Sequence, residues 1–198
     1  MVERMIGAVL AGGQSRRFGS PKAFAKRKDQ YFFQIAVDAL HPFVKEVYIV
    51  SHPDLVARFE RMVTNEKVVM DEERYRGQGP LAGLYTVMKQ TEADWIFVLP
   101  CDMPYIQSDT VGRMVSYVDH AFDIVISTHF GRLQPLVGAY HRRTMKWIEH
   151  VLQHGDNRMR SLFEHCAVRY VNEQDFWAEE IVFRNVNDLD EYADIAAE

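Results

Sequence analysis

Short apolar runs alternate with amphipathic stretches along the first two thirds of the chain. The apolar runs are rich in valine and isoleucine and occupy residues 6–10, 47–50, 67–70, 95–99 and 124–126. Because a strand covered by helices on both faces is apolar at successive positions, these runs predict strands of a parallel sheet. Stretches with helical spacing lie between them, at residues 31–40, 55–62, 81–89 and 111–118.

This alternation predicts an α/β fold: a doubly wound, mostly parallel sheet with helices on both faces and right-handed crossovers, giving three α/β/α layers. After residue 126 the pattern predicts a hairpin or antiparallel edge over 130–140, a helix over 144–152, and a last helix over 188–197 capped by Asn187 and Asp188. The C-terminal part is expected to complete the sheet and one wall of the cleft. Since no repeat or linker divides the sequence, residues 1–198 are expected to form a single domain.

Composition narrows the class of protein. A chain of 198 residues with 47% hydrophobic content can bury one substantial core. The only cysteines, Cys101 and Cys166, favour a reducing compartment, so we expect a cytoplasmic protein. The first apolar run is too short for a signal peptide and no segment approaches the span of a bilayer, so no membrane association is expected. The net charge of -5 argues against general affinity for nucleic acid, which requires neutralisation of many phosphates.

The loop after the first apolar run combines glycines with cations. Residues 10–22 read Leu-Ala-Gly-Gly-Gln-Ser-Arg-Arg-Phe-Gly-Ser-Pro-Lys, and residues 14–28 contain six Lys or Arg and no Asp or Glu. Glycines allow a backbone to approach a polyanion closely, and the cations neutralise its charge. The loop is one residue too long for a Walker A motif, has Ser20-Pro21 where that motif needs Lys-Ser/Thr, and matches no dinucleotide fingerprint. It is either a third kind of phosphate loop or a solvated surface turn.

Ligands of open parallel sheets bind beyond the carboxyl ends of the strands. That rule selects residues 10–22, Ser51, Asp71 and Asp102 and predicts that they line one crevice. A carboxylate at the end of a buried strand, as at Asp102, is well placed to hold Mg²⁺. The alternative is that Asp102 caps the helix expected near Ser108 or forms an Asx turn.

Two neighbouring features leave alternatives open. Asp71 has a strand-end position like that of Asp102, but Glu72 and Glu73 beside it make a solvated acidic run equally plausible. The segment 77–83, Gly-Gln-Gly-Pro-Leu-Ala-Gly, reads as a turn that feeds a helix, whose backbone N–H groups can receive a base edge or an anion.

Other candidate chemistry finds little support in the sequence. His150 and His154 have the spacing of zinc ligands but lack the glutamate and third ligand of the hydrolase motif. Ser15 has no histidine and acid partners at nucleophile-elbow spacing. Cys101 is better explained as a small buried side chain than as a nucleophile.

Five motifs together resemble a known family. They are Leu-Ala-Gly-Gly-x-Ser-x-Arg-x-Gly-x-x-Lys at 10–22, Pro-Leu-Ala-Gly at 80–83, Pro-Cys-Asp at 100–102, Gln-Pro-Leu at 134–136 and Asn-Val-Asn at 185–187. In this order they resemble the GT-A-like nucleotidyltransferases, and among these the molybdenum cofactor guanylyltransferases. The resemblance extends over nearly the whole chain. Ser51, where some members have asparagine, and residues 28–31, which replace a Gly-Lys-Pro turn, depart from the pattern.

The resemblance implies roles for individual residues. It implies nucleotide contacts for Leu10, Ala11 and Gly12 through the backbone, for Lys22 through the phosphates, and for Asp71, and it implies that Asp102 binds Mg²⁺ and contacts the nucleotide. Lys22 and Arg16 would offset the charge that develops on pyrophosphate. Gly12, where related cytidylyltransferases commonly have alanine, favours guanine.

The reaction that the resemblance implies is transfer of GMP from GTP to the terminal phosphate of molybdopterin, with release of pyrophosphate. The attacking phosphate monoester has a second pKa of about 6, so it needs no general base at neutral pH. The pterin is expected across the crevice, near 132–140 and 156–160, where Arg158 and Arg160 either hold its phosphate or lie on a helix surface. Proteins of the molybdenum cofactor pathway are possible partners. A molybdopterin cytidylyltransferase or other NTP-dependent enzyme, and a non-enzymatic nucleotide-binding protein, are the alternatives.

Overall fold

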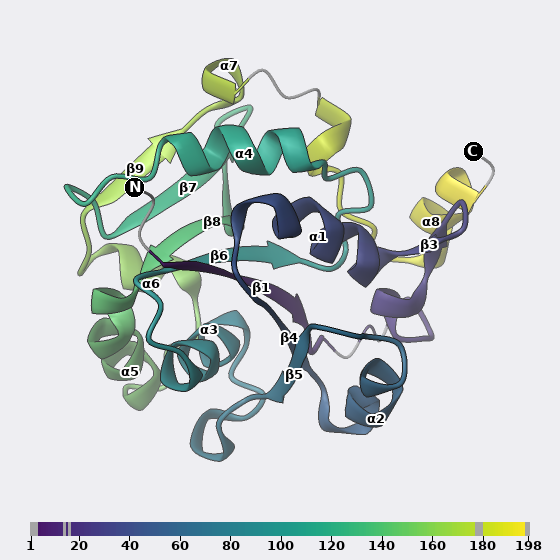
Figure 1. Cartoon of the computed structure of the whole chain (residues 1–198), viewed down its shortest axis with the longest axis horizontal. Helices are drawn as coiled ribbons and strands as arrows, with labels where there is room; N and C mark the ends of the chain where they lie inside the picture. Colours follow the sequence, from purple (N-terminus) through teal and green to yellow (C-terminus); the bar gives the residue numbers. More distant parts are fainter. Residues whose placement is uncertain (1–3, 14, 16, 177–179, 197–198) are drawn as a thin grey trace.

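The structure, a computed structural model, describes residues 4–13, 15, 17–176 and 180–196. Within these ranges one sheet has seven strands in the order β5-β4-β1-β6-β8-β7-β9 (Figure 1). The strands are β1 Met5–Ala11, β4 Val47–Ser51, β5 Lys67–Met70, β6 Trp95–Pro100, β7 Ile124–His129, β8 Arg132–His141 and β9 Val168–Val171. All five runs predicted as strands form strands, at bounds within a few residues of those expected.

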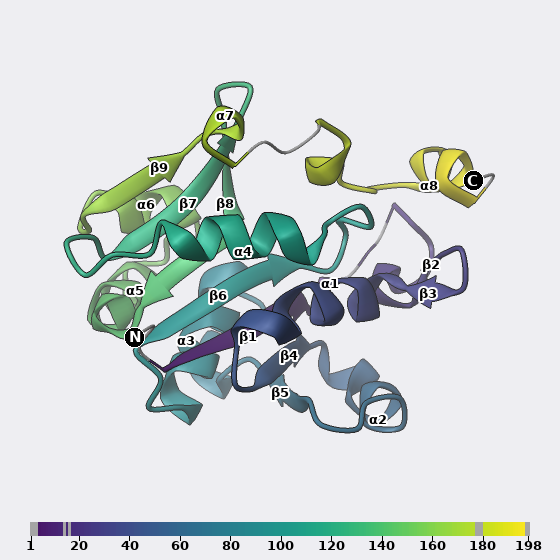
Figure 2. The same ribbon diagram turned by 45° about the horizontal axis from the view of Figure 1, so that its top comes forward.

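Helices cover both faces of the sheet (Figures 1 and 2). Helices α1, Phe32–Leu40, and α4, Ser108–Ser116, pack on one face. Helices α3, Pro80–Gln90, α5, Met145–Gln153, and α6, Met159–Phe163, pack on the other. Successive residues of the central strands enter opposite clusters, as Trp95 and Ile96 do, so a strand that is apolar throughout is buried on both sides. The predicted three-layer α/β/α fold is confirmed.

The C-terminal part of the sheet contains an antiparallel strand. Strand β8 runs antiparallel to both β6 and β7 and lies between them, and β9 pairs parallel with β7. Of the two forms predicted for 130–140, the hairpin is confirmed: residues 130–131 are its tip and β8 is its second strand. The alternative of an antiparallel edge is wrong, because β8 lies in the interior of the sheet. Phe130 and Gly131 form its tip with φ of 44° and 71°, the left-handed pair that a two-residue hairpin turn requires. The strand expected over 124–126 among parallel neighbours, which extends to residue 129 in the structure, therefore pairs antiparallel on one side.

Shorter elements complete the chain. They are α2 Val56–Glu60, α7 Glu173–Phe176, α8 Leu189–Ala196, the hairpin strands β2 Lys26–Arg27 and β3 Gln30–Tyr31, and 3₁₀ turns at Lys22–Phe24, His41–Phe43, Pro53–Leu55, Glu73–Tyr75, Arg142–Thr144 and Glu180–Phe183. Helix α8 lies beside the β2–β3 hairpin (Figure 2), where the Tyr192 hydroxyl accepts the N–H of Lys26 at 3.3 Å. Of the two predicted cap residues, Asp188 is confirmed, because its Oδ1 accepts the N–H of Glu191 at 2.9 Å, whereas the side chain of Asn187 accepts Lys22 instead.

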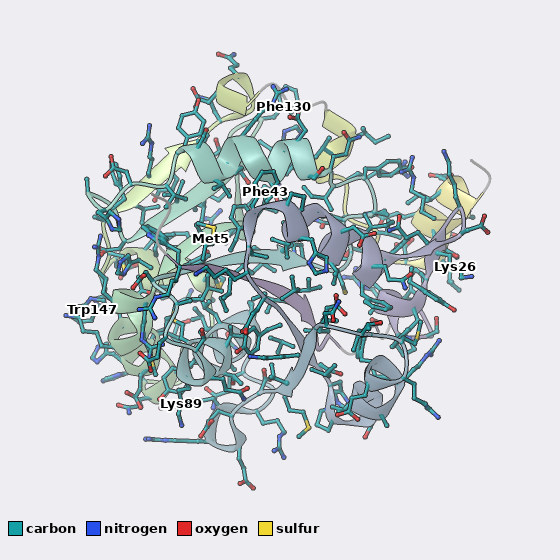
Figure 3. All side chains as sticks on the ribbon, viewed as in Figure 1. Met5, Lys26, Phe43, Lys89, Phe130 and Trp147 are labelled. Atoms are coloured by element: carbon teal, nitrogen blue, oxygen red, sulfur yellow. The ribbon has the colours of Figure 1, made fainter. Side chains whose placement is uncertain are left out.

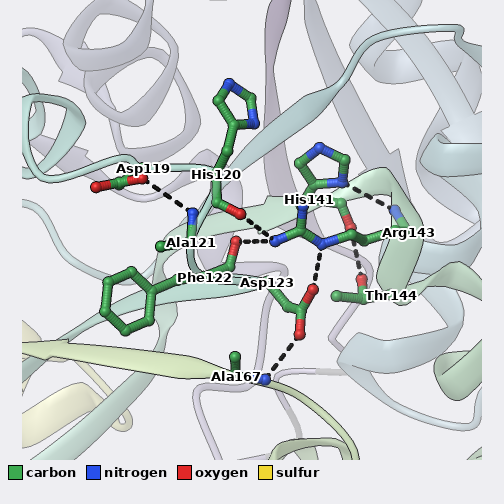
Figure 4. A network of polar contacts seen from close by, with 9 residues as sticks. All are labelled: Asp119, His120, Ala121, Phe122, Asp123, His141, Arg143, Thr144 and Ala167. Atoms are coloured by element: carbon green, nitrogen blue, oxygen red, sulfur yellow. Dashed lines mark hydrogen bonds and ion pairs between the residues drawn. The ribbon is translucent and has the colours of Figure 1, made fainter.

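A polar network ties three strands together at the end of the sheet opposite the carboxyl ends of the parallel strands (Figure 4). Arg143 donates to the Asp123 carboxylate and to the carbonyls of His120 and Phe122. Asp123 also accepts the N–H of Ala167, just before β9, at 2.7 Å. Burial raises the pKa of Asp123, but the hydrogen bonds from Arg143 and Ala167 outweigh it and hold that pKa below its usual value.

Apolar side chains fill the interior and charged ones surround it. Figure 3 shows Met5, which is 2% exposed, inside the molecule, and Lys89 at its periphery. In the described part of the chain, no helix has both the length and the apolar character needed to cross a membrane.

Candidate nucleotide-binding site

A pocket of about 790 Å³ opens at the carboxyl ends of the parallel strands. It lies where the winding reverses, since β4 and β5 follow β1 on one side and β6 lies on the other. Loops that leave β1 and β6 therefore diverge and leave a crevice. The pocket is lined by the predicted residues Leu10, Ala11, Gly12, Lys22, Asp71 and Asp102, together with Ser51. The prediction of one shared crevice is confirmed.

Ser15 shapes the loop after β1. Its Oγ accepts the N–H of Lys22 at 3.1 Å, and its carbonyl accepts the N–H of Phe18 at 2.9 Å. Ser15 and Gly19 have φ of 46° and 71°, so the chain turns tightly at both positions. The serine thus holds the loop closed on itself, a role the sequence analysis missed. Arg16 lies outside the described residues.

Lys22 joins the two sides of the crevice. Its Nζ lies 3.5 Å from Oδ2 of Asp102 and donates to Oδ1 of Asn187 at 3.1 Å. The side chains of Lys22 and Asp102 are 13% and 26% exposed, so water screens this pair only partly. Asn187 belongs to the Asn-Val-Asn motif and to a predicted helix start, but neither pattern predicts its place in the site.

Asp102 does not cap the following helix. Helix α4 begins at Ser108, and its N-cap residue is Gln107, whose side chain makes no capping hydrogen bond. Burial raises the pKa of Asp102, and the charge and hydrogen bond of Lys22 oppose that rise. Burial also raises the pKa of the neighbouring Cys101 thiol far above its usual range, which keeps the thiol protonated and unreactive.

Asp71 connects the end of β5 to the second glycine loop. Its Oδ2 accepts the N–H of Gly77 at 3.1 Å. Burial raises its pKa, against the lowering effects of that hydrogen bond and of the Arg76 charge. Its neighbour Glu72 instead pairs with Lys89 at 2.8 Å. Of the two interpretations left open, the structure favours a carboxylate that belongs to the pocket.

The second loop brings a helix N-terminus against the central strands. Gly79 has φ of 78° and precedes Pro80, the first residue of α3. A Cβ on Gly83 would lie 3.0 Å from Cγ1 of Val50 and 3.2 Å from Cδ2 of Leu10. Glycine at position 83 therefore allows α3 to approach β1 and β4 closely beside the pocket.

The remaining candidate residues lie either at the pocket or on the surface. Ser51 is buried and its Oγ donates to the carbonyl of His52 at 2.9 Å. His52 and Arg76 also line the pocket, although neither was predicted, because neither belongs to a motif of the sequence. Arg158 donates to Asp156 and is 76% exposed, which agrees with a surface arginine.

Comparison with known proteins identifies the family. The family model described as MobA-like NTP transferase domain matches residues 7–172. The chain belongs to this family. It is 64% identical to the "Probable molybdenum cofactor guanylyltransferase" of Geobacillus sp. (strain WCH70), over 98% of this chain and 99% of the relative. It is 34% identical to the protein of the same name from Bacillus cytotoxicus, over 98% and 97% of the two chains.

A solved structure supports the fold of this MobA-like chain. The molybdopterin-guanine dinucleotide biosynthesis protein A of Archaeoglobus fulgidus superposes with a TM-score of 0.81 at 20% sequence identity, covering 97% of each chain. The matched family segment ends at residue 172, so Asn187 and helix α8 lie beyond it.

Proposed function

We propose that this chain transfers GMP from GTP to the terminal phosphate of molybdopterin, giving molybdopterin guanine dinucleotide and pyrophosphate. The observation that carries the proposal is the convergence of Lys22 and Asp102, from the loops after β1 and β6, on the pocket lined by the glycine loop. The relative that is 64% identical bears the name of this activity, which supports GTP and molybdopterin as the substrates.

The chemistry needs charge neutralisation and alignment more than proton transfer. The attacking phosphate monoester, with a second pKa of about 6, is already mostly dianionic at neutral pH. The barrier comes from bringing one polyanion in line with another. The Lys22 ammonium and the backbone N–H groups of the glycine loop supply positive potential where pyrophosphate leaves. Arg16 is proposed to add a second cation there.

The nucleoside is proposed to lie between the loops after β1, β4 and β5. There the backbone of Leu10, Ala11 and Gly12 contacts the nucleotide, and Asp71 contacts it from the opposite wall. A Cβ at Gly12 would project to 3.6 Å from the His52 nitrogen at the end of β4. Glycine therefore leaves space in that corner of the pocket, which supports accommodation of the larger guanine base.

The residues present fit a magnesium ion. Asp102 Oδ2 and Asn187 Oδ1, both hard oxygen donors, already gather around one cationic group, the ammonium of Lys22. A single carboxylate suits Mg²⁺, which usually takes one or two protein carboxylates and completes its shell with phosphates and water. We propose that Asp102 and Asn187 hold it, where it would neutralise phosphate charge. When Lys22 turns to the phosphates of GTP, its ammonium leaves these two oxygens free.

The acceptor is proposed to approach from the side of β8 and the segment before α6. Leu136 of β8 lines the pocket, and the Asn157 carbonyl lies 3.6 Å from a Cβ placed on Gly79. The segment before α6 therefore adjoins the second glycine loop, and β8 reaches the same pocket. Three statements remain predictions from the sequence: that the chain forms a single domain, that it is located in the cytoplasm, and that it interacts with proteins of the molybdenum cofactor pathway.

Transfer of label tests the function directly. Purified chain is incubated with molybdopterin, Mg²⁺ and GTP labelled at the α-phosphate, with CTP labelled in the same way in a parallel reaction. Label should pass from GTP to molybdopterin with release of pyrophosphate. Preferential transfer from CTP would establish a cytidylyltransferase instead, and tight GTP binding without turnover would establish a binding protein.

A further inference from the structure

Helix α8 is tied to the cation site through Glu191. The Glu191 carboxylate accepts the backbone N–H of Asn187 at 2.5 Å, while its own N–H is capped by Asp188. In an ordinary capping box the glutamate three residues into the helix accepts the N–H of the cap residue, here Asp188. Glu191 instead accepts the N–H of Asn187, the residue before the cap, and the side chain of Asn187 reaches into the site.

Two contacts link Asn187 and its neighbour Val186 to Asp102. Its Oδ1 accepts Lys22 Nζ at 3.1 Å, and that ammonium lies 3.5 Å from Asp102 Oδ2. The adjacent Val186 donates its backbone N–H to the Asp102 carbonyl at 2.9 Å. Glu191 therefore restricts the backbone of Asn187, the residue that carries one of the two oxygens gathered around the ammonium.

The charge of Glu191 lies beside the site. Its carboxylate oxygen is 2.5 Å from the backbone nitrogen of Asn187, the residue whose Oδ1 accepts Lys22 Nζ. A negative charge this close to an oxygen that gathers a cation adds to the attraction for that cation.

We propose that Glu191 is a positioning residue for the transfer reaction, which orients Asn187 through its backbone and adds negative charge behind the cation held by Asp102 and Asn187. The inference rests on the proposed function. It assigns to the C-terminal helix, which lies beyond the matched family segment, a part in catalysis in addition to stability.

The contribution to catalysis is separable from capping. Loss of a helix cap lowers the stability of the fold and leaves the affinity of the folded protein for a metal unchanged. Loss of a side chain that orients a metal ligand typically lowers metal affinity or activity by about 10- to 100-fold. Glu191→Ala removes the hydrogen bond and the charge, whereas Glu191→Gln keeps an acceptor oxygen and removes only the charge.

Asp190 provides the matched control. It lies in the same first turn of α8, is exposed, and carries the same charge. Asp190→Asn therefore reproduces the loss of one negative charge from the helix N-terminus without touching Asn187.

The experiment uses the full chain and measures the Kd for Mn²⁺ at saturating GTP by electron paramagnetic resonance, kcat and KM for GTP, and Tm. Glu191→Ala should weaken Mn²⁺ binding and lower kcat by about 10-fold or more each, with KM for GTP changed less than kcat. Glu191→Gln should fall between Glu191→Ala and the unaltered chain, and Asp190→Asn should match the unaltered chain.

Mn²⁺ affinity and kcat within twofold of the unaltered chain in both Glu191 variants would overturn the proposal. Equal losses in Asp190→Asn would also overturn it. If Glu191→Ala fails to fold, Glu191→Gln decides the question. Absence of label transfer by the unaltered chain would contradict the proposed function, while the Mn²⁺ measurements would still test the positioning of Asn187 by Glu191.

Discussion

Substitution of Lys22 by methionine separates two roles of one ammonium group. Methionine keeps much of the length and apolar bulk of the side chain and removes the charge. In the structure this charge is shared by Asp102 and Asn187, and in the proposed reaction it moves to the phosphates. Lys22→Met should therefore impair turnover and, at the same time, strengthen the binding of a divalent metal in the absence of nucleotide.

The size of both effects follows from the geometry. Two unit charges 3.5 Å apart attract by about 5 kcal/mol at an effective dielectric constant near 20, and desolvation offsets most of that attraction. The net value of a hydrogen bond to a charged group, about 1.5–3 kcal/mol, is the better guide. Release of Asp102 should strengthen Mn²⁺ binding by about 10-fold or more, since 1.4 kcal/mol corresponds to a factor of ten. Removal of a preorganised charge from the reacting phosphates should lower kcat by about 100-fold or more.

Stability should change much less than turnover. Asp102 is 26% exposed and can be hydrated once Lys22 is gone, which recovers part of the ~1.5–3 kcal/mol, so we expect a loss of about 1 kcal/mol in the free energy of unfolding. The assays are label transfer from GTP, Mn²⁺ binding without nucleotide, and thermal unfolding. A fall in Tm that accounts for the fall in rate, or unchanged or weaker Mn²⁺ binding in Lys22→Met, would refute this reasoning.

Three further substitutions test other parts of the structure. Asp102→Asn should abolish Mg²⁺-dependent transfer while the fold persists, and undiminished activity at ordinary Mg²⁺ concentrations would contradict its assignment as a ligand. Gly83→Ala should lower the free energy of unfolding in urea by about 1–3 kcal/mol and weaken GTP binding, because its Cβ would lie 3.0 Å from Val50; unchanged values would show that α3 does not need this close approach. Asp123→Asn should remove the charge and leave one acceptor oxygen for two donors, Arg143 and the Ala167 N–H, which should cost about 1.5–3 kcal/mol and leave the transfer rate per folded molecule unchanged. The folded pKa of Asp123 is lowered, so the stabilisation it provides is present above the unfolded pKa of about 3.9 and is lost as pH falls through the folded pKa. Urea titrations should therefore show that the variant loses less stability in acid than the unaltered chain does.

The layers of the fold could be predicted from the sequence because a strand buried on both faces of the sheet is apolar at successive positions. A strand such as Trp95–Pro100 is apolar at every position, and its neighbours carry helical spacing, so strand and helix could be assigned without knowledge of their partners. The strand-end rule then selected Asp71, Asp102 and the loop ending at Lys22 from their positions alone.

Tertiary structure decided the features that depend on contacts between distant segments. Alternation along Arg132–His141 predicts an antiparallel strand but is the same at an edge and in the interior, so the insertion of β8 between β6 and β7 left no local signal. Asn187 is 165 residues from Lys22 in sequence, and its neighbour Glu191 reads locally as one more acidic residue in a helix start. Local pattern records burial and turn geometry, whereas the choice of partner for a buried charge is fixed only when packing brings the loops after β1 and β6 and the start of α8 together.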